Sequence, residues 1–200
     1  MVDGWIVMSS TYRQASRDRP RARMVDPENK LVWRMNRRRL DLEAMRDSLL
    51  AISGRLDRRL AGRPVNFLAV PESGRRTVYG LVDRQNLAGF FRSFDFASPD
   101  QSSAMRPQTI VPQQALFALN SKFILLQARA LARSAEGKSV PDKITSLYRR
   151  VYSRDPANDE LTLALNFVSK QQTSKDSQQL SSLEQLAQIL LASNELMFVD

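Results

Sequence analysis

The stretch VPQQALFALNSKFILLQARALA, residues 111–132, decides the class of fold that this sequence predicts. Pro112 stands where the first residue of a helix would stand, because its missing N–H would have no helical partner there. Asn120 and Ser121 then interrupt the apolar pattern, and a serine at this place favours the N-cap of a second helix. We therefore predict two helices that meet at a sharp corner beside Ser121.

Other parts of the chain have the same helical spacing of apolar residues. One helix is expected over about 38–55, and three more are expected after residue 139. The last of these opens with a capping box, in which Ser181 and Glu184 satisfy each other's backbone N–H groups. The apolar stripes expected to face a core are Leu42, Met45, Leu49, Ile52 and Leu56 in the first of these helices, and Val140, Ile144, Leu147 and Val151 in the second.

The segment over about 63–84 has a different pattern. Its two runs VNFLAV and RTVYGLV are rich in β-branched and aromatic residues and flank the turn-like PESGR, which predicts a β-hairpin. Residues 16–27, 95–108 and 171–179 are rich in polar residues or proline and are expected to be a linker and two loops. The predicted fold class is mainly α, a compact orthogonal helical bundle with this small β-hairpin insertion. We expect a single domain over residues 1–200.

The N-terminal run WIVMSSTYRQ, residues 5–14, is typical of the end of a helix. Its apolar residues need a partner surface that the few preceding residues do not supply. We therefore expect a truncated first helix and an exposed apolar surface near Trp5, Ile6 and Met8.

Composition narrows the possible functions more than it defines one. The chain carries a formal charge of +9 and contains neither histidine nor cysteine. A His-based triad, a His- or Cys-ligated metal and thiol chemistry are therefore excluded, and we expect no cofactor. The basic excess suits acidic partners of several kinds. No apolar run approaches the roughly 20 residues of a membrane span. Met1 to Met8 lack the pattern of a signal peptide, so a chain made as given is expected to stay in the cytoplasm.

An arginine run precedes the expected helix over 38–55. Acids follow at helical spacing, since Glu43 stands four residues after Arg39 and Asp47 four after Glu43. We interpret the group as a ladder of ion pairs that aligns or docks this helix. Contact with an anion or glycan, or with nucleic acid, is the alternative, although no base-stacking aromatic motif accompanies the run. The candidate interaction residues here are Arg34, Arg37, Arg38, Arg39, Glu43, Arg46 and Asp47.

Arg75, Arg76 and Tyr79 form a second candidate group. In the expected hairpin they could make a ligand surface of arginine and aromatic rings, or the arginines could simply face solvent. No spacing of acids matches a calcium loop. A carboxylate-based enzyme, such as one acting on carbohydrate, needs acids that meet in space, and spacing along the chain cannot supply that evidence.

Several long phrases resemble one family in the order in which they occur. They are VMSSTYRQAS, DPENKLVWRMNRRRLDLEAMRDSLLAISGRLD, RRTVYGLVDRQNL, FDFASPD, TIVPQQALFALNSKFILLQARALA and LLASNELMFVD. Together they resemble a domain of unknown function, number 1553, that is common in planctomycetes. The resemblance implies the C-terminal part of large exported bacterial proteins, often behind a cytochrome c-type domain, and hence an extracytoplasmic place. This chain lacks the haem motif, so electron transfer does not carry over.

Three hypotheses for function follow. The first is a non-catalytic helical interaction domain that docks onto upstream domains of the family or onto an acidic protein or glycan surface. The second is a carboxylate-based or carbohydrate-active enzyme, which the absence of histidine and cysteine disfavours. The third is nucleic-acid binding through Arg34 to Arg39.

Overall fold

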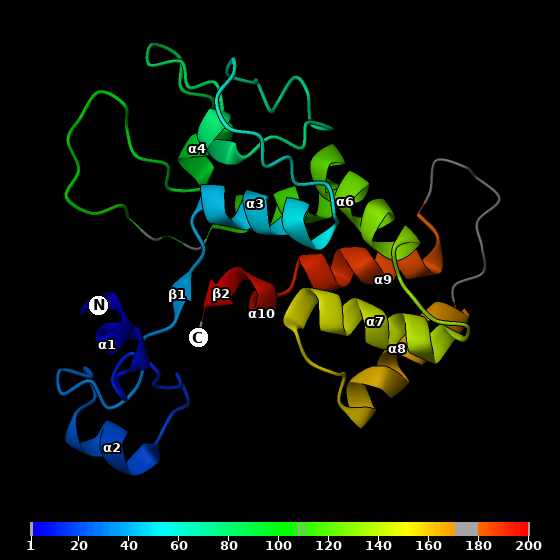
Figure 1. The fold of residues 1–200 in the computed structure, drawn as a ribbon, viewed down its shortest axis with the longest axis horizontal. Helices are drawn as coiled ribbons and strands as arrows, with labels where there is room; N and C mark the ends of the chain where they lie inside the picture. Colours follow the sequence, from blue (N-terminus) through cyan, green and yellow to red (C-terminus); the bar gives the residue numbers. More distant parts are fainter. Residues whose placement is uncertain (1, 108, 110, 171–179, 200) are drawn as a thin grey trace. The chain divides into compact units, whose positions relative to one another are not determined.

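The computed structural model describes residues 2–107, 109, 111–170 and 180–199, and the fold is mainly α (Figure 1). The predicted loop over 171–179 lies outside these residues. A single 3₁₀ turn, η1 (Thr77–Tyr79), and one small antiparallel sheet, β1 (Arg38–Arg39) with β2 (Phe198–Val199), complete the described elements. The predicted class, mainly α with little β-structure, is confirmed. The α-helices are α1 (Val2–Met8), α2 (Pro20–Val25), α3 (Leu42–Ile52), α4 (Gly89–Ser93), α5 (Pro112–Asn120), α6 (Lys122–Arg133), α7 (Val140–Tyr152), α8 (Asn158–Lys170), α9 (Ser182–Leu191) and α10 (Asn194–Met197).

The chain divides into two compact units. The N-terminal unit comprises the chain up to Arg39 together with β2, and the helical unit comprises Leu40–Met197. Each is described by itself, and the prediction of a single domain stays a prediction.

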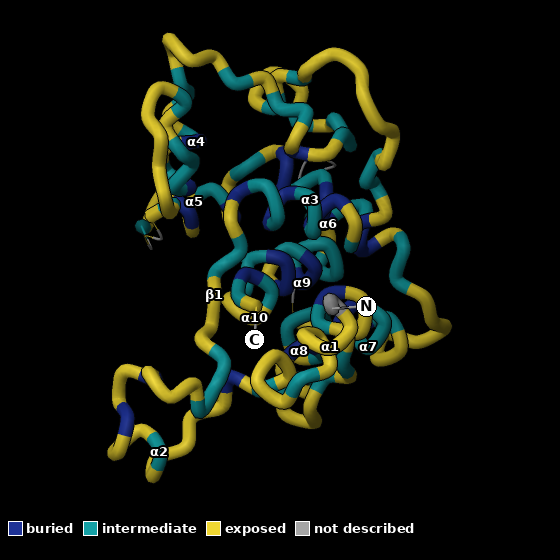
Figure 2. The backbone as a smooth tube through the Cα atoms, turned by 60° about the vertical axis from the view of Figure 1, so that its left-hand side comes forward, coloured by how far each residue is buried: buried dark blue, intermediate teal, exposed yellow. Residues whose placement is uncertain are grey.

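The helical unit contains the apolar core. Its most extensive helix packing is that of α6 against α9, and α7 and α8 pack against each other and against α9. Each large apolar side chain that is fully buried in such a core contributes roughly 1.5–3 kcal/mol to the free energy of unfolding. The dark blue of buried residues accordingly gathers on α3, α6 and α9 (Figure 2). The largest fully buried apolar side chains are Leu42, Leu49, Leu50, Ile124, Leu131, Ile144, Leu147 and Leu191.

The predicted corner at Ser121 is confirmed. α5 and α6 meet at a bend of 53°, and the Ser121 hydroxyl accepts a hydrogen bond from the Phe123 N–H at 3.2 Å, as an N-cap does. Among the described residues, no single helix has the length and apolar character of a membrane span. Only α5 and α6 taken together reach them, by length and composition alone, with the bend between them.

The capping boxes of the C-terminal half also form. Ser181 and Glu184 exchange hydrogen bonds at the start of α9, as predicted, and Ser139 with Asp142 does the same for α7. Of the stripe predicted for α7, Val140 is an exception and is exposed, because it is the first residue of the helix. Ile144, Leu147 and Val151 are buried.

The helix predicted over 38–55 is shorter than expected. Asp41 accepts a hydrogen bond from the Ala44 N–H at 2.9 Å and caps α3, so the helix begins at Leu42. It ends at Ile52, two residues before Gly54, whose φ of +74° is the left-handed conformation that ends helices. The arginine run therefore lies outside the helix.

The β-hairpin predicted over 63–84 is wrong in its place. Among the described residues of this segment, strand pairing is limited to single parallel bridges, Val65 with Gly80 and Asp57 with Arg75. The reason lies in competing side chains. The side-chain amide oxygen of Asn66 accepts hydrogen bonds from the N–H groups of Leu68 and Ala69, and the Asp47 carboxylate accepts the Thr77 N–H at 2.7 Å. Because these N–H groups bond to side chains, they cannot pair with a neighbouring strand, and the segment folds as a loop.

The linker predicted over 16–27 is also not wholly irregular, because α2 begins at Pro20 within it. Polar groups organise the chain after this helix. The Asp26 carboxylate accepts the N–H groups of Lys30 and Leu31, and its carbonyl accepts the indole N–H of Trp33 at 2.8 Å. Asn29 donates to the Arg34 carbonyl at 2.8 Å and accepts the Arg34 N–H at 3.3 Å. The N-terminal unit is thus ordered by hydrogen bonds.

An ion-pair group joins the end of α7 to α8 and α10. Arg154 donates two hydrogen bonds to Glu160, at 2.7 and 2.8 Å, and two to Glu195, at 2.7 and 2.8 Å. The bonds from Arg154 lower the pKa of Glu160 from 4.5 to about 2. The group is partly exposed, so its contribution is sensitive to solvent screening.

Replacing Glu160 by glutamine is expected to make the free energy of unfolding fall less steeply as the pH is lowered. Because the folded-state pKa of Glu160 is depressed, its pairing stabilises the fold above pH 4.5 and is lost as the pH falls to about 2. Urea unfolding measured between pH 4.5 and about pH 2 should show the free energy of unfolding falling more steeply with decreasing pH for the wild type than for Glu160→Gln. Equal slopes would show that the bonds to Arg154 contribute nothing in solution.

Candidate interaction surfaces

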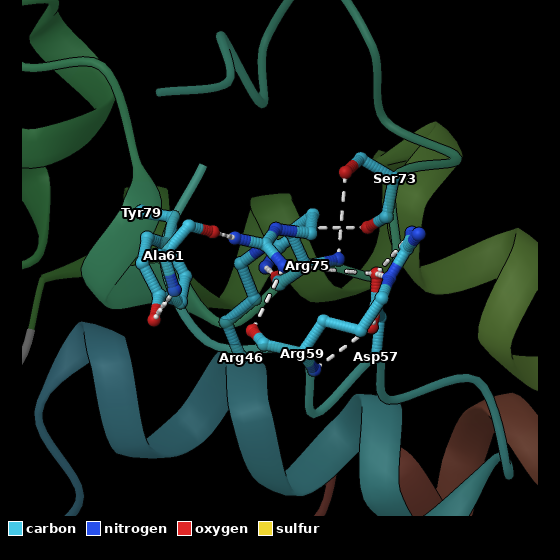
Figure 3. Close-up of polar contacts among 7 residues, drawn as sticks. All are labelled: Arg46, Asp57, Arg59, Ala61, Ser73, Arg75 and Tyr79. Atoms are coloured by element: carbon cyan, nitrogen blue, oxygen red, sulfur yellow. Dashed lines mark hydrogen bonds and ion pairs between the residues drawn. The ribbon is translucent and has the colours of Figure 1, made fainter. Parts of the chain in front are cut away.

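Arg46, one of the candidate residues on α3, is almost wholly buried, with 4% of its surface exposed. Its guanidinium donates to the carbonyls of Arg75 and Ser73, at 2.7 Å each (Figure 3). It also donates to the Thr77 hydroxyl at 3.4 Å. Burial lowers the pKa of Arg46 to about 10, and the charge of Asp47 opposes this shift. The side chain therefore fastens the loop over 73–77 to α3.

The acids of the predicted ladder contact other residues than those expected. Asp47 accepts the Thr77 hydroxyl at 2.7 Å and the Arg76 Nε at 3.3 Å, and Glu43 accepts Arg106 at 2.8 Å. Arg39 lies in β1 and not on α3, because the cap at Asp41 starts the helix after it. The predicted ladder of ion pairs along one face of the helix is thus wrong, because Glu43 pairs with Arg106, and Arg39 lies outside the helix.

Arg75 and Tyr79 contact each other, with the guanidinium carbon 4.1 Å from the ring centroid. The Arg75 guanidinium donates to the carbonyls of Arg59, at 2.8 Å, and Ala61, and the Tyr79 hydroxyl accepts the Ala61 N–H at 2.8 Å. Figure 3 shows these side chains gathered within one loop. The pair is thus mostly enclosed, with 14% of the Arg75 side chain exposed, and it organises the loop around it.

The arginine run belongs to the N-terminal unit. Arg34 lies 5.2 Å from the centroid of the Trp33 ring, and the Arg37 Nε donates to the Ser16 hydroxyl at 3.3 Å. Arg38 and Arg39 form β1. Because Arg37 and Arg38 are exposed, this strand and the residue before it present positive charge to solvent.

The same unit exposes most of its large apolar side chains. Trp5 is 79% exposed and Met8 68%, so the predicted exposure of Trp5, Ile6 and Met8 is confirmed. Among the side chains described over residues 4–39 and 198–199, those that are buried are polar: Ser16, Asp26 and Asn29. In Figure 2 the tube around α2 is mostly yellow, with short dark-blue and teal stretches. Other exposed apolar side chains are Val7, Tyr12, Met24, Val25, Leu31 and Val32.

An open groove of about 610 Å³ lies beside α3 and is lined in part by Asp41, Glu43 and Asp47. A carboxylate-based enzyme requires acids that meet in a concave surface, and here they do so beside Arg58 and Arg76. Each of the three carboxylates, however, already accepts a hydrogen bond from within the chain, Asp41 from Ala44, Glu43 from Arg106 and Asp47 from Thr77. Within the described residues, no group of three or more acids could hold a metal ion.

Sequence patterns did not identify Asp57, Phe67 and Thr77, which complete the loop around Arg46 and Arg75. The Phe67 ring lies 3.7 Å from the Arg46 guanidinium carbon. Asp57 binds Arg59, and this bond lowers the pKa of Asp57 to about 2. An aspartate two residues before an arginine in a glycine-flanked loop was the available local signal for Asp57. No local signal marks the other two.

A family model described as "Protein of unknown function (DUF1553)", PSD1, matches residues 4–168. The match covers most of the chain, with parts of both units. No curated protein and no solved structure matches it.

Proposed function

Since this chain belongs to the DUF1553 family of unknown function, we propose that it is a non-catalytic interaction domain whose N-terminal unit docks onto an acidic protein surface. One observation carries the proposal: this unit exposes Trp5, Met8 and several other apolar side chains and has no buried apolar side chain among those described. Units below about 40 residues usually need a partner, a metal or disulfides to be stable. Exposed apolar surface of this kind is typical of a protein interface.

Charge supports an acidic partner. Residues 1–39 contain ten arginine and lysine residues and four aspartate and glutamate residues, a net charge of +6 out of +9 for the whole chain. The positive charge is therefore concentrated next to the exposed apolar side chains. Such a combination favours a partner with an apolar patch and an acidic rim, and it speeds encounter at low salt.

The family resemblance suggests the first partner to test. It implies that members stand behind other domains in exported bacterial proteins, so an extracytoplasmic location is part of the proposal. The test partner is the purified set of domains that precedes this one in a longer family member. An acidic surface on those domains is the counterpart that the N-terminal unit requires.

The experiment is a calorimetric titration of those domains into the full chain at low and high salt. Trp5→Ser is expected to weaken binding by about 30-fold, since a buried interfacial tryptophan commonly contributes 2 kcal/mol or more. Arg38→Glu is expected to weaken binding at low salt and to reduce the dependence of the affinity on salt.

The matched control is Leu163→Ser, which removes an exposed leucine from α8 of the helical unit. Its affinity should equal that of the wild type. Docking through the N-terminal unit onto these domains would be ruled out if Trp5→Ser and Leu163→Ser lost the same amount of affinity. It would also be ruled out if the wild type did not bind the domains at low salt.

A further inference from the structure

The helical unit contains a pocket that the proposed docking does not use. Its volume is about 230 Å³, and it lies between α3, the loop over 67–71, α4 and the corner of α5 and α6. Ligand pockets for drug-sized molecules are commonly about 300–1,000 Å³, so this one suits a smaller molecule. Its lining residues are Met45, Arg46, Phe67, Leu68, Pro71, Phe90, Phe117, Ser121, Lys122 and Phe123.

The wall of the pocket is rich in aromatic rings. Phe90 and Phe117 contact each other with their ring centroids 4.8 Å apart. Phe67 and Phe123 both contact Arg46, whose guanidinium carbon is 3.7 Å from the first ring centroid and 5.0 Å from the second. Such a wall favours a flat apolar group, which can stack or pack edge to face against the rings.

The charges of the lining are all positive. Arg46 is buried, and the hydrogen bonds of its guanidinium go to two carbonyls and a hydroxyl. Asp47 acts on it through space, but among the described residues no carboxylate oxygen lies within 4.0 Å of it. Lys122 is exposed and, within the described chain, makes no ion pair. Buried charges in proteins are normally paired, so the pocket lacks a counter-ion.

We propose that this pocket binds a small carboxylate with a phenyl-sized apolar body. The ring would lie among Phe67, Phe90 and Phe117, and the carboxylate would face Lys122 at the first turn of α6. The N-terminus of that helix adds to the positive potential there. Arg46 contributes charge from within the wall while its hydrogen bonds stay with the loop.

The test uses 3-phenylpropionate as the probe, titrated into the isotope-labelled full chain and followed by amide chemical shifts. Shifts are expected in residues that line the pocket, with a Kd of about 0.1–1 mM for a ligand of this size. The neutral 3-phenylpropionamide and the small propionate are each expected to bind at least about tenfold more weakly, because each lacks one half of the recognised chemistry.

Two variants separate the charge from the apolar wall. Lys122→Ala is expected to weaken binding about fivefold, and Leu68→Trp, which fills the pocket from an exposed position, should abolish it. Lys138→Ala, an exposed lysine outside the pocket, is the control and should bind as the wild type does. Unchanged thermal unfolding shows that the variants are folded.

Equal binding of the acid and the amide, or equal affinities of Lys122→Ala and Lys138→Ala, would overturn the proposal, as would an absence of shifts at the pocket. None of these results bears on docking through the N-terminal unit, which Trp5→Ser tests separately.

Discussion

Replacing Arg46 by methionine is expected to lower the free energy of unfolding by about 3 kcal/mol. The guanidinium donates to the carbonyls of Ser73 and Arg75 at 2.7 Å each, and methionine leaves both of these partly buried acceptors without that donor. Each such loss costs about 1–3 kcal/mol, and removal of the buried charge offsets part of the sum. The contact of the guanidinium with the Phe67 ring is lost as well.

Urea unfolding followed by circular dichroism measures the loss in Arg46→Met. Arg133→Met is the matched control, because Arg133 is exposed at the end of α6, and it should change stability by less than about 0.5 kcal/mol. Amide exchange should also become faster over 73–80 in Arg46→Met alone. A loss no larger than that of the control would mean that Arg46 does not fasten this loop.

Replacing Asn29 by alanine is expected to remove the order of residues 26–36 while the helical unit stays folded. Asn29 has a φ of 56°, in the left-handed region that asparagine tolerates better than alanine. Its side chain also makes hydrogen bonds with Arg34 and Asn36. The combined local cost is about 2–3 kcal/mol, and among the described residues of the N-terminal unit no buried apolar side chain compensates for it.

Native-state hydrogen exchange should therefore show loss of protection over 26–36 in Asn29→Ala, with an unchanged midpoint for unfolding of the helical unit. Glu28→Ala, in the same loop, removes only an exposed ion pair with Lys30 and is the control. If Asn29→Ala lowered the unfolding midpoint of the helical unit as well as the amide protection over 26–36, the two units would be shown to unfold as one.

The parts of the fold that the sequence predicted correctly depend on local chemistry. Ser121 and Ser181 cap their helices through N–H groups two and three residues away, and the buried residues of α7 lie one turn apart. Such signals are contained in a short window of sequence, so no knowledge of distant segments is needed. The corner at Ser121 and the mainly α class follow from them.

The loop over 63–84 was mispredicted because distant residues decide its backbone. Asp47 takes the N–H of Thr77, 30 residues away, and Arg46 takes the carbonyl of Ser73, 27 residues away. β-propensity is weak enough for such bonds to override it.

The sequence predicts the residues of the candidate site only as separate groups, because the contacts that join them link residues far apart in the chain. Arg46, Asp47, Arg75, Arg76 and Tyr79 were all named from the sequence, but as two separate groups, and the structure joins them around one loop. Lys122 and the ring of Phe67 had no signal, because only the folded chain brings them to one pocket.

The central claim is that the N-terminal unit is a docking surface, and amide exchange of the full chain with and without the preceding domains of a longer family member tests it most directly. Protection from exchange is expected to rise over residues 4–39 in the complex and to stay constant in the core helices α6, α7 and α9. Protection that rises only in the helical unit, or nowhere at saturating partner, would contradict it.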